Sequence, residues 1–465
     1  MNLHNTICAI ATPPGEGAIA IIRISGEESF DITEQIFSPF KKNIKLSEIK
    51  SHTLTYGHII DNNEILDEVL IAVYKKPHSY TGENSIEIFC HGSTYIQRRI
   101  IQLLLEAGAT LAQPGEFTLR AFLNGKLDLA QAEAVADLIS SKSKITANLA
   151  IKQLKGVFSN QIKKLKTKLV DLLSLIELEL DFGEENVEFA DKSELLTTID
   201  EIEKWATELL NSFKFGNALK EGIPVAITGK PNVGKSTLLN LLLKENKAIV
   251  SEIPGTTRDV VEDVINIKGV RFRLIDTAGI RNTKDVVEKL GIERSLEAIK
   301  KAEINIVVLD ATLPLKENEE HLKKVYYNKD ENSKIFVLIN KIDLASKEKI
   351  SDIKKLAKSF NAYAMEIVAK NNKYAEKIYE KIYEISEVAN FLEEESIIIN
   401  ERHYQALNKI NEAIKEVKKG LEMELPTDLL TQELRQIMFY LSEVAGEVTE
   451  NDILENIFSK FCIGK

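Results

Sequence analysis

The sequence GKPNVGKS at residues 229–236 lies in the middle of the chain. It matches the phosphate-binding pattern G-x-x-x-x-G-K-[ST]. The apolar run PVAIT precedes it and the helical run STLLNLLLKEN follows its lysine. This strand, turn and helix form the context that the pattern requires, because the loop N–H groups and the helix N-terminus bind phosphate. The segment therefore predicts a nucleotide-binding domain with a long stretch of chain on either side.

Three domains are expected in a chain of 465 residues. Residues 1–118 contain short β-rich runs and turn signals, which predict an α+β domain. Residues 119–217 and 385–465 carry apolar residues at three- and four-residue steps, which predicts helices. Residues 218–384 alternate apolar runs with helical stretches, which favours a parallel sheet covered by helices. Because every apolar helix face must be buried, we expect the two helical stretches to form one domain with the α/β domain inserted.

The composition excludes several classes of protein. The net charge of −11 argues against a free-standing RNA-binding module with a basic face, so RNA contact needs a local basic patch or a partner. The cysteines Cys8, Cys90 and Cys462 are too far apart for a metal-binding spacing and are expected to be reduced thiols. The chain shows neither a signal peptide nor an apolar run of membrane-spanning length, so we expect a cytoplasmic protein.

Three further elements follow the phosphate loop in the order typical of GTPases. Thr256 and Thr257 lie in the loop SEIPGTTRD, where a hydroxyl completes the Mg²⁺ shell. The sequence DTAG at 276–279 ends a strand, where an acid holds Mg²⁺ through water and a glycine N–H senses the γ-phosphate. The sequence NKID at 340–343 ends the later strand KIFVLIN and resembles the N-K-x-D element of GTPases, whose aspartate accepts two hydrogen bonds from guanine. The nucleotide is therefore expected to be GTP.

The motifs assign the phosphates and the metal ion to particular side chains. Lys235 is expected to reach the β- and γ-phosphates and Ser236 to bind Mg²⁺. The predicted GTP-binding residues are Asn232, Val233, Gly234, Lys235, Ser236, Thr237, Ser251, Glu252, Ile253, Pro254, Gly255, Thr256, Thr257, Asp276, Thr277, Ala278, Gly279, Asn340, Lys341 and Asp343. The last guanine-contact motif reads VAK at 368–370 in place of the expected SAK. Because that contact mainly uses the alanine backbone, guanine specificity is expected to survive.

The usual catalytic groups of Ras-like enzymes are absent from the motif loops. Ile280 stands where a glutamine orients the attacking water, and the nearby arginines are typical of solvated surface charges. We therefore hypothesise that the side-chain oxygen of Asn232 and carbonyls of the loop 251–257 hold a monovalent cation beside the β–γ bridge. Such a cation would stabilise the charge that an arginine finger otherwise stabilises.

The chain resembles the MnmE (TrmE) family along its whole length. The resemblance is carried by GKPNVGKS, SEIPGTTRD, DTAGIR and NKID, by ATPPGEGAIAIIRISG and PGEFTLRAFLNGKLDLAQAEAVADLI near the start, and by the final FCIGK. It implies a GTPase that works with an FAD-dependent MnmG-type partner, as a heterotetramer. The pair would add an aminomethyl or carboxymethylaminomethyl group at C5 of the wobble uridine of tRNA. The implied fold is a folate-binding, dimer-forming N-terminal domain and a helical domain with an inserted GTPase.

The resemblance also assigns ligands residue by residue. It implies K⁺ at Asn232, Ser251, Ile253 and Thr256, Mg²⁺ at Ser236 and Thr257, and a catalytic, water-orienting acid at Glu288 beside catalytic Lys235. Without the resemblance, Glu288 reads as a solvated helix charge. A 5-formyl- or methylene-tetrahydrofolate is implied at four residues. These are Arg23, Glu83, Lys126 and Lys465, with Arg120 an alternative to Lys126 in the same motif.

Two other classes of GTPase compete with this interpretation. An Era-like regulatory or ribosome-assembly GTPase would carry a basic RNA-binding module, but residues 391–465 hold 8 Lys and Arg against 15 Asp and Glu. A dynamin-like GTPase on membranes would be expected to show a basic amphipathic helix, which the sequence lacks.

Overall fold

The computed structural model describes residues 5–41, 44–181, 192–246, 263–275, 288–388, 400–423, 425, 427–447, 454, 457–459, 461 and 464. These residues form two compact units. One comprises residues 1–139, 150–203 and 406–465, and the other comprises residues 140–149 and 204–405. The second unit is thus inserted into the first in sequence, and the long helix α7 (Lys192–Glu221) contributes residues to both.

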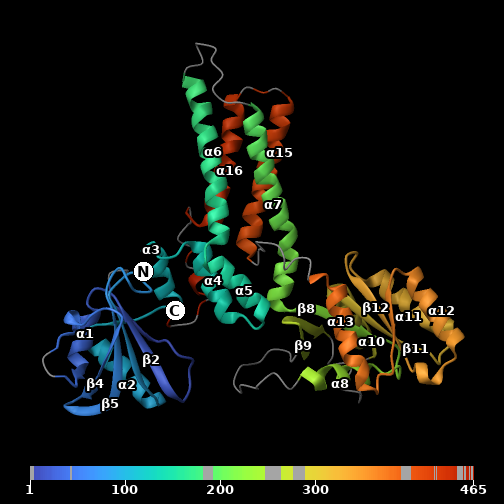
Figure 1. Cartoon of the computed structure of the whole chain (residues 1–465), viewed down its shortest axis with the longest axis horizontal. Coiled ribbons are helices and arrows are strands. Elements are labelled where there is room, and N and C mark those ends of the chain that lie inside the picture. The colour runs from blue at the N-terminus through green and yellow to red at the C-terminus, as the bar shows by residue number, and fades with distance from the viewer. Residues whose placement is uncertain are drawn as a thin grey trace. The chain divides into compact units, whose positions relative to one another are not determined.

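The N-terminal part of the first unit is a mixed sheet covered by helices on one face (Figure 1). Its strand order is β3 (Phe37–Pro39), β4 (Thr53–Asp61), β5 (Glu64–Tyr74), β6 (Ser85–Gly92), β2 (Gly17–Ser25), β1 (Ile7–Ile10) and β7 (Thr110–Leu111). All neighbours are antiparallel except β1 and β7. Alternate strand residues form one core with helices α1 (Ser29–Ile36) and α2 (Thr94–Glu106).

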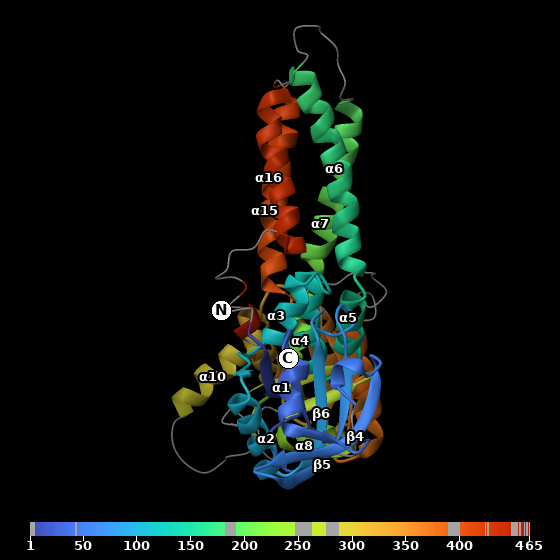
Figure 2. The ribbon, with the colours of Figure 1, turned by 90° about the vertical axis from the view of Figure 1, so that its left-hand side faces the viewer.

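The rest of the first unit is helical. It contains α3 (Glu116–Leu123), α4 (Leu129–Ser140), the end of α5 (Lys144–Leu154), α6 (Val157–Asp181), the start of α7, α15 (Glu401–Glu422) and α16 (Thr427–Ala445). Figure 2 shows α6, α15 and α16 as long neighbouring rods, and α6 packs on α16. Lys168 of α6 pairs with Glu201 of α7, and Lys418 of α15 pairs with Glu203. The helices on the two sides of the insertion therefore form one bundle.

The second unit is a doubly wound α/β fold. The strand order is β13 (Tyr363–Glu366), β12 (Lys334–Asn340), β11 (Ile304–Asp310), β8 (Ile223–Thr228), β10 (Val270–Ile275) and β9 (Asp263–Ile267). Only β9 pairs antiparallel among these strands. Helices α8 (Lys235–Asn246) and α13 (Ala375–Ile385) share the core on one face. Helices α10 (Glu288–Lys301), α11 (Leu315–Asn328) and α12 (Lys347–Ser359) share the core on the other.

Candidate functional site

The phosphate loop joins β8 to α8 at the carboxyl edge of the parallel sheet, where ligands bind in open α/β folds. Asn232 and Gly234 both adopt positive φ, at 61° and 104°. A Cβ on Gly234 would lie 2.4 Å from Nδ2 of Asn340, so glycine is required there for close approach as well as for conformation. Asparagine tolerates the left-handed region better than most residues, which fits Asn232 to its position.

The side-chain amine of Lys235 lies within the phosphate loop. Its Nζ donates to the carbonyls of Gly229 at 2.5 Å and Lys230 at 2.8 Å. Burial lowers the pKa of Lys235, because a low-dielectric environment disfavours the ammonium. An anionic phosphate beside it would stabilise the charged form. Ser236 and Thr237, at the start of α8, have exposed side chains that are open to a ligand.

The NKID segment is bonded to the phosphate loop. Asn340, buried at the end of β12, donates from Nδ2 to the carbonyl of Val233 at 2.7 Å and accepts at Oδ1 from the N–H of Ala369 at 2.9 Å. Lys341 donates from Nζ to the carbonyl of Asn232 at 3.0 Å and to Asp310 at 2.6 Å. Four segments far apart in sequence, at residues 232–233, 310, 340–341 and 369, therefore meet at the carboxyl ends of the parallel strands.

Helix α11 contacts the phosphate loop, and no sequence motif indicates this contact. Glu317 forms an ion pair with Lys230 at 3.1 Å. One turn later, His321 is largely buried, and its Nε2 has no hydrogen-bond partner among the described residues. Burial lowers the pKa of His321 to about 4, and the charges of Lys235, Lys324 and Lys230 act in the same direction. No sequence motif contains Glu317 or His321. Asp310, by contrast, could have been identified from the sequence as a candidate site residue, because it is the acid that ends the apolar run INIVVLD.

Several predicted site residues lie outside the described part of the chain. They are Ser251, Glu252, Ile253, Pro254, Gly255, Thr256, Thr257, Asp276, Thr277, Ala278, Gly279 and Lys465. Glu288 is the first residue of α10, and its side chain is also outside the description. The predicted K⁺ cage, the Mg²⁺ threonine and the water-orienting acid therefore stay predictions.

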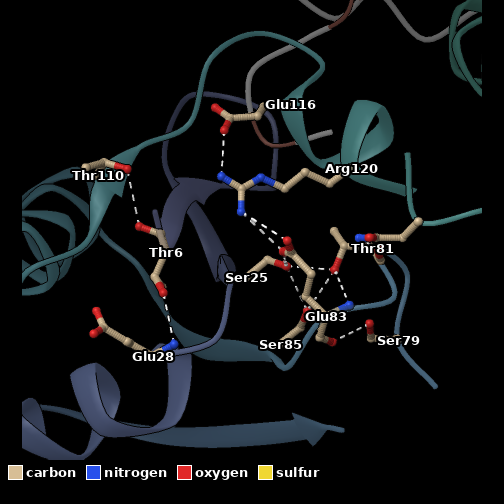
Figure 3. A network of polar contacts seen from close by, with 11 residues as sticks. Thr6, Ser25, Glu28, Ser79, Thr81, Glu83, Ser85, Thr110, Glu116 and Arg120 are labelled. Atoms are coloured by element: carbon tan, nitrogen blue, oxygen red, sulfur yellow. Dashed lines mark hydrogen bonds and ion pairs between the residues drawn. The ribbon is translucent and has the colours of Figure 1, made fainter. Parts of the chain in front are cut away.

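A second polar cluster lies where the inner strand β2 ends and its neighbour β6 begins (Figure 3). Arg120 of α3 is only 2% exposed and donates to Glu116 at 2.8 Å and to Glu83 at 3.2 Å. Glu83 also accepts from the hydroxyl of Ser25 at 2.7 Å. Arg120 thus fixes the carboxylate of Glu83, which keeps part of its surface exposed.

The other predicted folate residues border the same loop, residues 77–84. Arg23 pairs with Glu87 at 2.7 Å, and its guanidinium lies 5.4 Å from the centre of the Tyr80 ring. Lys126 donates to the carbonyl of Pro77 at 3.1 Å. Gly464 lies against β1, where a Cβ on it would come within 2.3 Å of the Ile10 carbonyl oxygen.

The chain matches two family models. The model described as GTP-binding protein TrmE N-terminus covers residues 6–126, and the model described as MnmE helical domain covers residues 129–462. The chain belongs to the MnmE family. The predicted multidomain fold, with an α+β N-terminal domain, a helical domain and an inserted P-loop GTPase, is confirmed, as is the enzyme class.

Relatives of the MnmE family match from end to end. The tRNA modification GTPase MnmE of Bacteroides thetaiotaomicron is 48% identical over 99% of this chain and 100% of its own length. The proteins of the same name from Parabacteroides distasonis and Flavobacterium johnsoniae are also 48% identical, over 99% of this chain and 100% and 99% of their lengths. Among the described helices, none is both apolar enough and long enough to span a lipid bilayer.

Proposed function

We propose that this protein is a K⁺-dependent GTPase that acts in the cytoplasm with a flavin-dependent, MnmG-type partner. The pair adds an aminomethyl or carboxymethylaminomethyl group to C5 of the wobble uridine of certain tRNAs. The observation that carries the proposal is the bonded set of GKPNVGKS, NKID and Asp310 at the edge of the sheet. It supplies a guanine-nucleotide site in a chain whose full-length relatives are named tRNA modification GTPases.

The cation hypothesis centres on Asn232. Its main chain is held by Lys341 in a left-handed conformation, in a loop whose GTP-binding partner segment 251–257 lies outside the description. Bound K⁺ would supply positive charge at the β–γ bridge, while Lys235 holds the phosphates and Ser236 and Thr257 hold Mg²⁺. We expect K⁺ to stimulate GTP hydrolysis more than Na⁺ does, and Asn232→Ser to lose that difference. Equal stimulation by K⁺ in the variant would contradict the assignment.

The cluster around residues 77–84 is suited to a folate. Glu83, fixed by Arg120 and Ser25, presents a carboxylate that can accept from the N–H groups of a pterin. Arg23 and Lys126 supply cations for the carboxylates of the glutamate tail, and Gly464, which precedes the proposed ligand Lys465, lies against β1 of the same sheet. Tetrahydrofolate, when bound, would supply the one-carbon unit. A folate titration should show weaker binding by a protein that lacks Lys465.

A homodimer fits the uncovered face of the N-terminal sheet. Cross-strand neighbours Tyr56 and Leu70 are 41% and 42% exposed, and Leu54 beside them is 61% exposed. Phe40 is 72% exposed, and its ring centre lies 5.7 Å from that of Tyr56. Such a contiguous apolar surface marks an interface, and a second copy of this chain is the occupant we propose. Sedimentation of Leu54→Asp/Leu70→Glu should shift the protein from dimer towards monomer.

A further inference from the structure

The positive charge of this acidic chain is concentrated in one segment. Residues 138–170 contain eight lysines and no aspartate or glutamate, although the chain as a whole has a net charge of −11. At the average frequency, about five acidic residues would fall in a segment of this length. The segment is therefore a local basic region of the kind that an acidic protein needs if it is to contact nucleic acid itself.

Four of these lysines surround the corner where α5 ends and α6 begins. Lys152 lies in the last turn of α5, Lys155 directly follows that helix, and Lys163 and Lys164 lie about two turns into α6. We call these four residues the lysine corner. All four are exposed, and none has an ion-pair partner among the described residues.

The neighbouring charges do not neutralise the lysine corner. The next two lysines of α6 are paired, Lys166 with Glu447 beyond α16 and Lys168 with Glu201 of α7. Glu443 of α16 is within 3.9 Å of Lys409. Glu447, Glu201 and Glu443 are thus each within ion-pair distance of another lysine, and the ion pairs among the described residues include none of the four amines of the corner.

The backbone beneath the lysine corner is fixed by two side-chain amides. Gln131 of α4 donates to the carbonyl of Leu154 at 3.0 Å, and Gln153 of α5 donates back to the carbonyl of Ala130 at 3.2 Å. Gly156 turns the chain with φ of 77°, and a Cβ there would lie 3.3 Å from Nε2 of Gln131. The lysines therefore extend from a rigid support.

The chemistry of the corner favours a polyanion over other partners. The apolar residues Ile162, Leu165 and Leu169 of α6 are buried in the bundle, and the exposed Ile151 and Val170 are too far apart among the described residues to form the continuous apolar face that a membrane-binding helix needs. Protein interfaces are depleted in lysine and depend on aromatic and apolar anchors. Flexible, unpaired amines are suited to phosphodiesters, which they bind without reading bases.

We propose that the lysine corner binds the sugar–phosphate backbone of the tRNA substrate. The proposal rests on the proposed function in tRNA modification. Contacts between these lysines and several successive phosphates position the tRNA on the helical part of the first unit. Such contacts do not depend on the base sequence of the tRNA. The GTPase and folate residues are not involved.

The test is the quadruple variant K152Q/K155Q/K163Q/K164Q in the full-length protein. Binding of purified tRNA is measured by fluorescence anisotropy between 50 and 300 mM KCl. We expect tRNA affinity at 50 mM salt to fall at least about tenfold and the salt-dependence slope to decrease by about 3 to 4, since each lost phosphate contact contributes nearly one. GTP hydrolysis without tRNA should be unchanged.

The matched control is K300Q/K347Q/K358Q/K377Q, which removes the same charge from exposed lysines of the GTPase unit. It should keep the wild-type slope. Equal losses in both variants, unchanged binding by the corner variant, or no tRNA binding by the wild-type protein would overturn the proposal. So would a corner variant that binds tRNA normally but no longer binds the flavoprotein, which would make the corner a protein-docking surface.

Failure of this proposal can be separated from failure of the proposed function. If tRNA from a strain lacking the gene has lost its wobble modification while the corner variant binds tRNA normally, only the lysine corner is wrong. If the modification is present in that strain, the proposed function itself is wrong.

Discussion

The side-chain amide of Asn340 lies 2.7 Å from the carbonyl oxygen of Val233 and thereby joins the NKID segment to the phosphate loop. The same side chain accepts from Ala369, so one buried group holds three segments in register. The replacement of the expected Ser by Val368 does not remove this contact, because the Ala369 main chain makes it.

Asn340→Ala should weaken GTP binding without unfolding the protein. It leaves the Val233 carbonyl and the Ala369 N–H without their partner, and a buried polar group in that state costs about 1–3 kcal/mol. We expect the Kd for GTP, measured with a fluorescent analogue, to rise about 10- to 100-fold. An unchanged Kd would show that the bonds do not organise the site.

Glu317→Gln tests whether α11 positions the phosphate loop. The ion pair with Lys230 is partly exposed, so its loss should cost no more than about 1 kcal/mol. We expect the KM for GTP to rise about two- to fivefold with kcat nearly constant. Glu319→Gln serves as the control. It removes the Glu319–Lys323 pair of the same helix, which forms no ion pair with the phosphate loop among the described residues. Glu317→Asp should restore part of the effect, and equal KM values for the two glutamine variants would contradict the role.

Arg120→Met should destabilise the N-terminal domain, whereas Arg23→Met should mainly weaken folate binding. Loss of Arg120 leaves the buried Glu116 and the carboxylate of Glu83 uncompensated, and breaking such a buried pair costs about 3–5 kcal/mol. Thermal unfolding measured with and without 5-formyltetrahydrofolate separates the two effects. The distinction between a structural and a ligand-binding arginine fails if both variants unfold at the same temperature.

The buried imidazole of His321 predicts a loss of stability in acid. Its pKa of about 4 lies below the ordinary value of 6.5. Between these two pH values the unfolded chain therefore binds a proton at His321 that the folded chain does not bind. Stability should therefore be lost as the pH falls from 6.5 to 4, by about 3 kcal/mol at most. Trp205, the single tryptophan of the chain, lies in the same unit and reports urea unfolding by fluorescence. His321→Leu should flatten the pH dependence, and parallel pH profiles would refute the assignment.

Local sequence patterns predicted those strands and helices whose apolar residues form one continuous run or one regular spacing along the chain. Within residues 218–384, the predicted apolar runs include RFRLI, INIVVLD and KIFVLIN, which form the strands β10, β11 and β12. Within residues 385–465, the predicted three- and four-residue apolar spacing runs from His403 to Leu421 and forms helix α15. The antiparallel strand β9 was not predicted, because its sequence DVINI depends on pairing with β10 for its structure.

Contacts between distant segments could not be read from the sequence. Glu317 and Lys230 are 87 residues apart, and nothing in either local pattern indicates that they meet. Arg120 likewise looked interchangeable with Lys126 in one motif, and only burial separates them. Arg120 lies in the interior between two carboxylates, whereas Lys126 reaches a loop carbonyl at the surface. The domain boundaries at residues 118, 217 and 385 stay predictions.

The wobble nucleosides of tRNA test the central claim most directly. Total tRNA from a strain lacking the gene is digested and analysed by mass spectrometry, with complementation by the wild-type protein or by Lys235→Ala. We predict loss of 5-aminomethyl and 5-carboxymethylaminomethyl uridines in the deletion, restoration by the wild type and no restoration by Lys235→Ala. An unchanged nucleoside profile in the deletion strain would contradict the account.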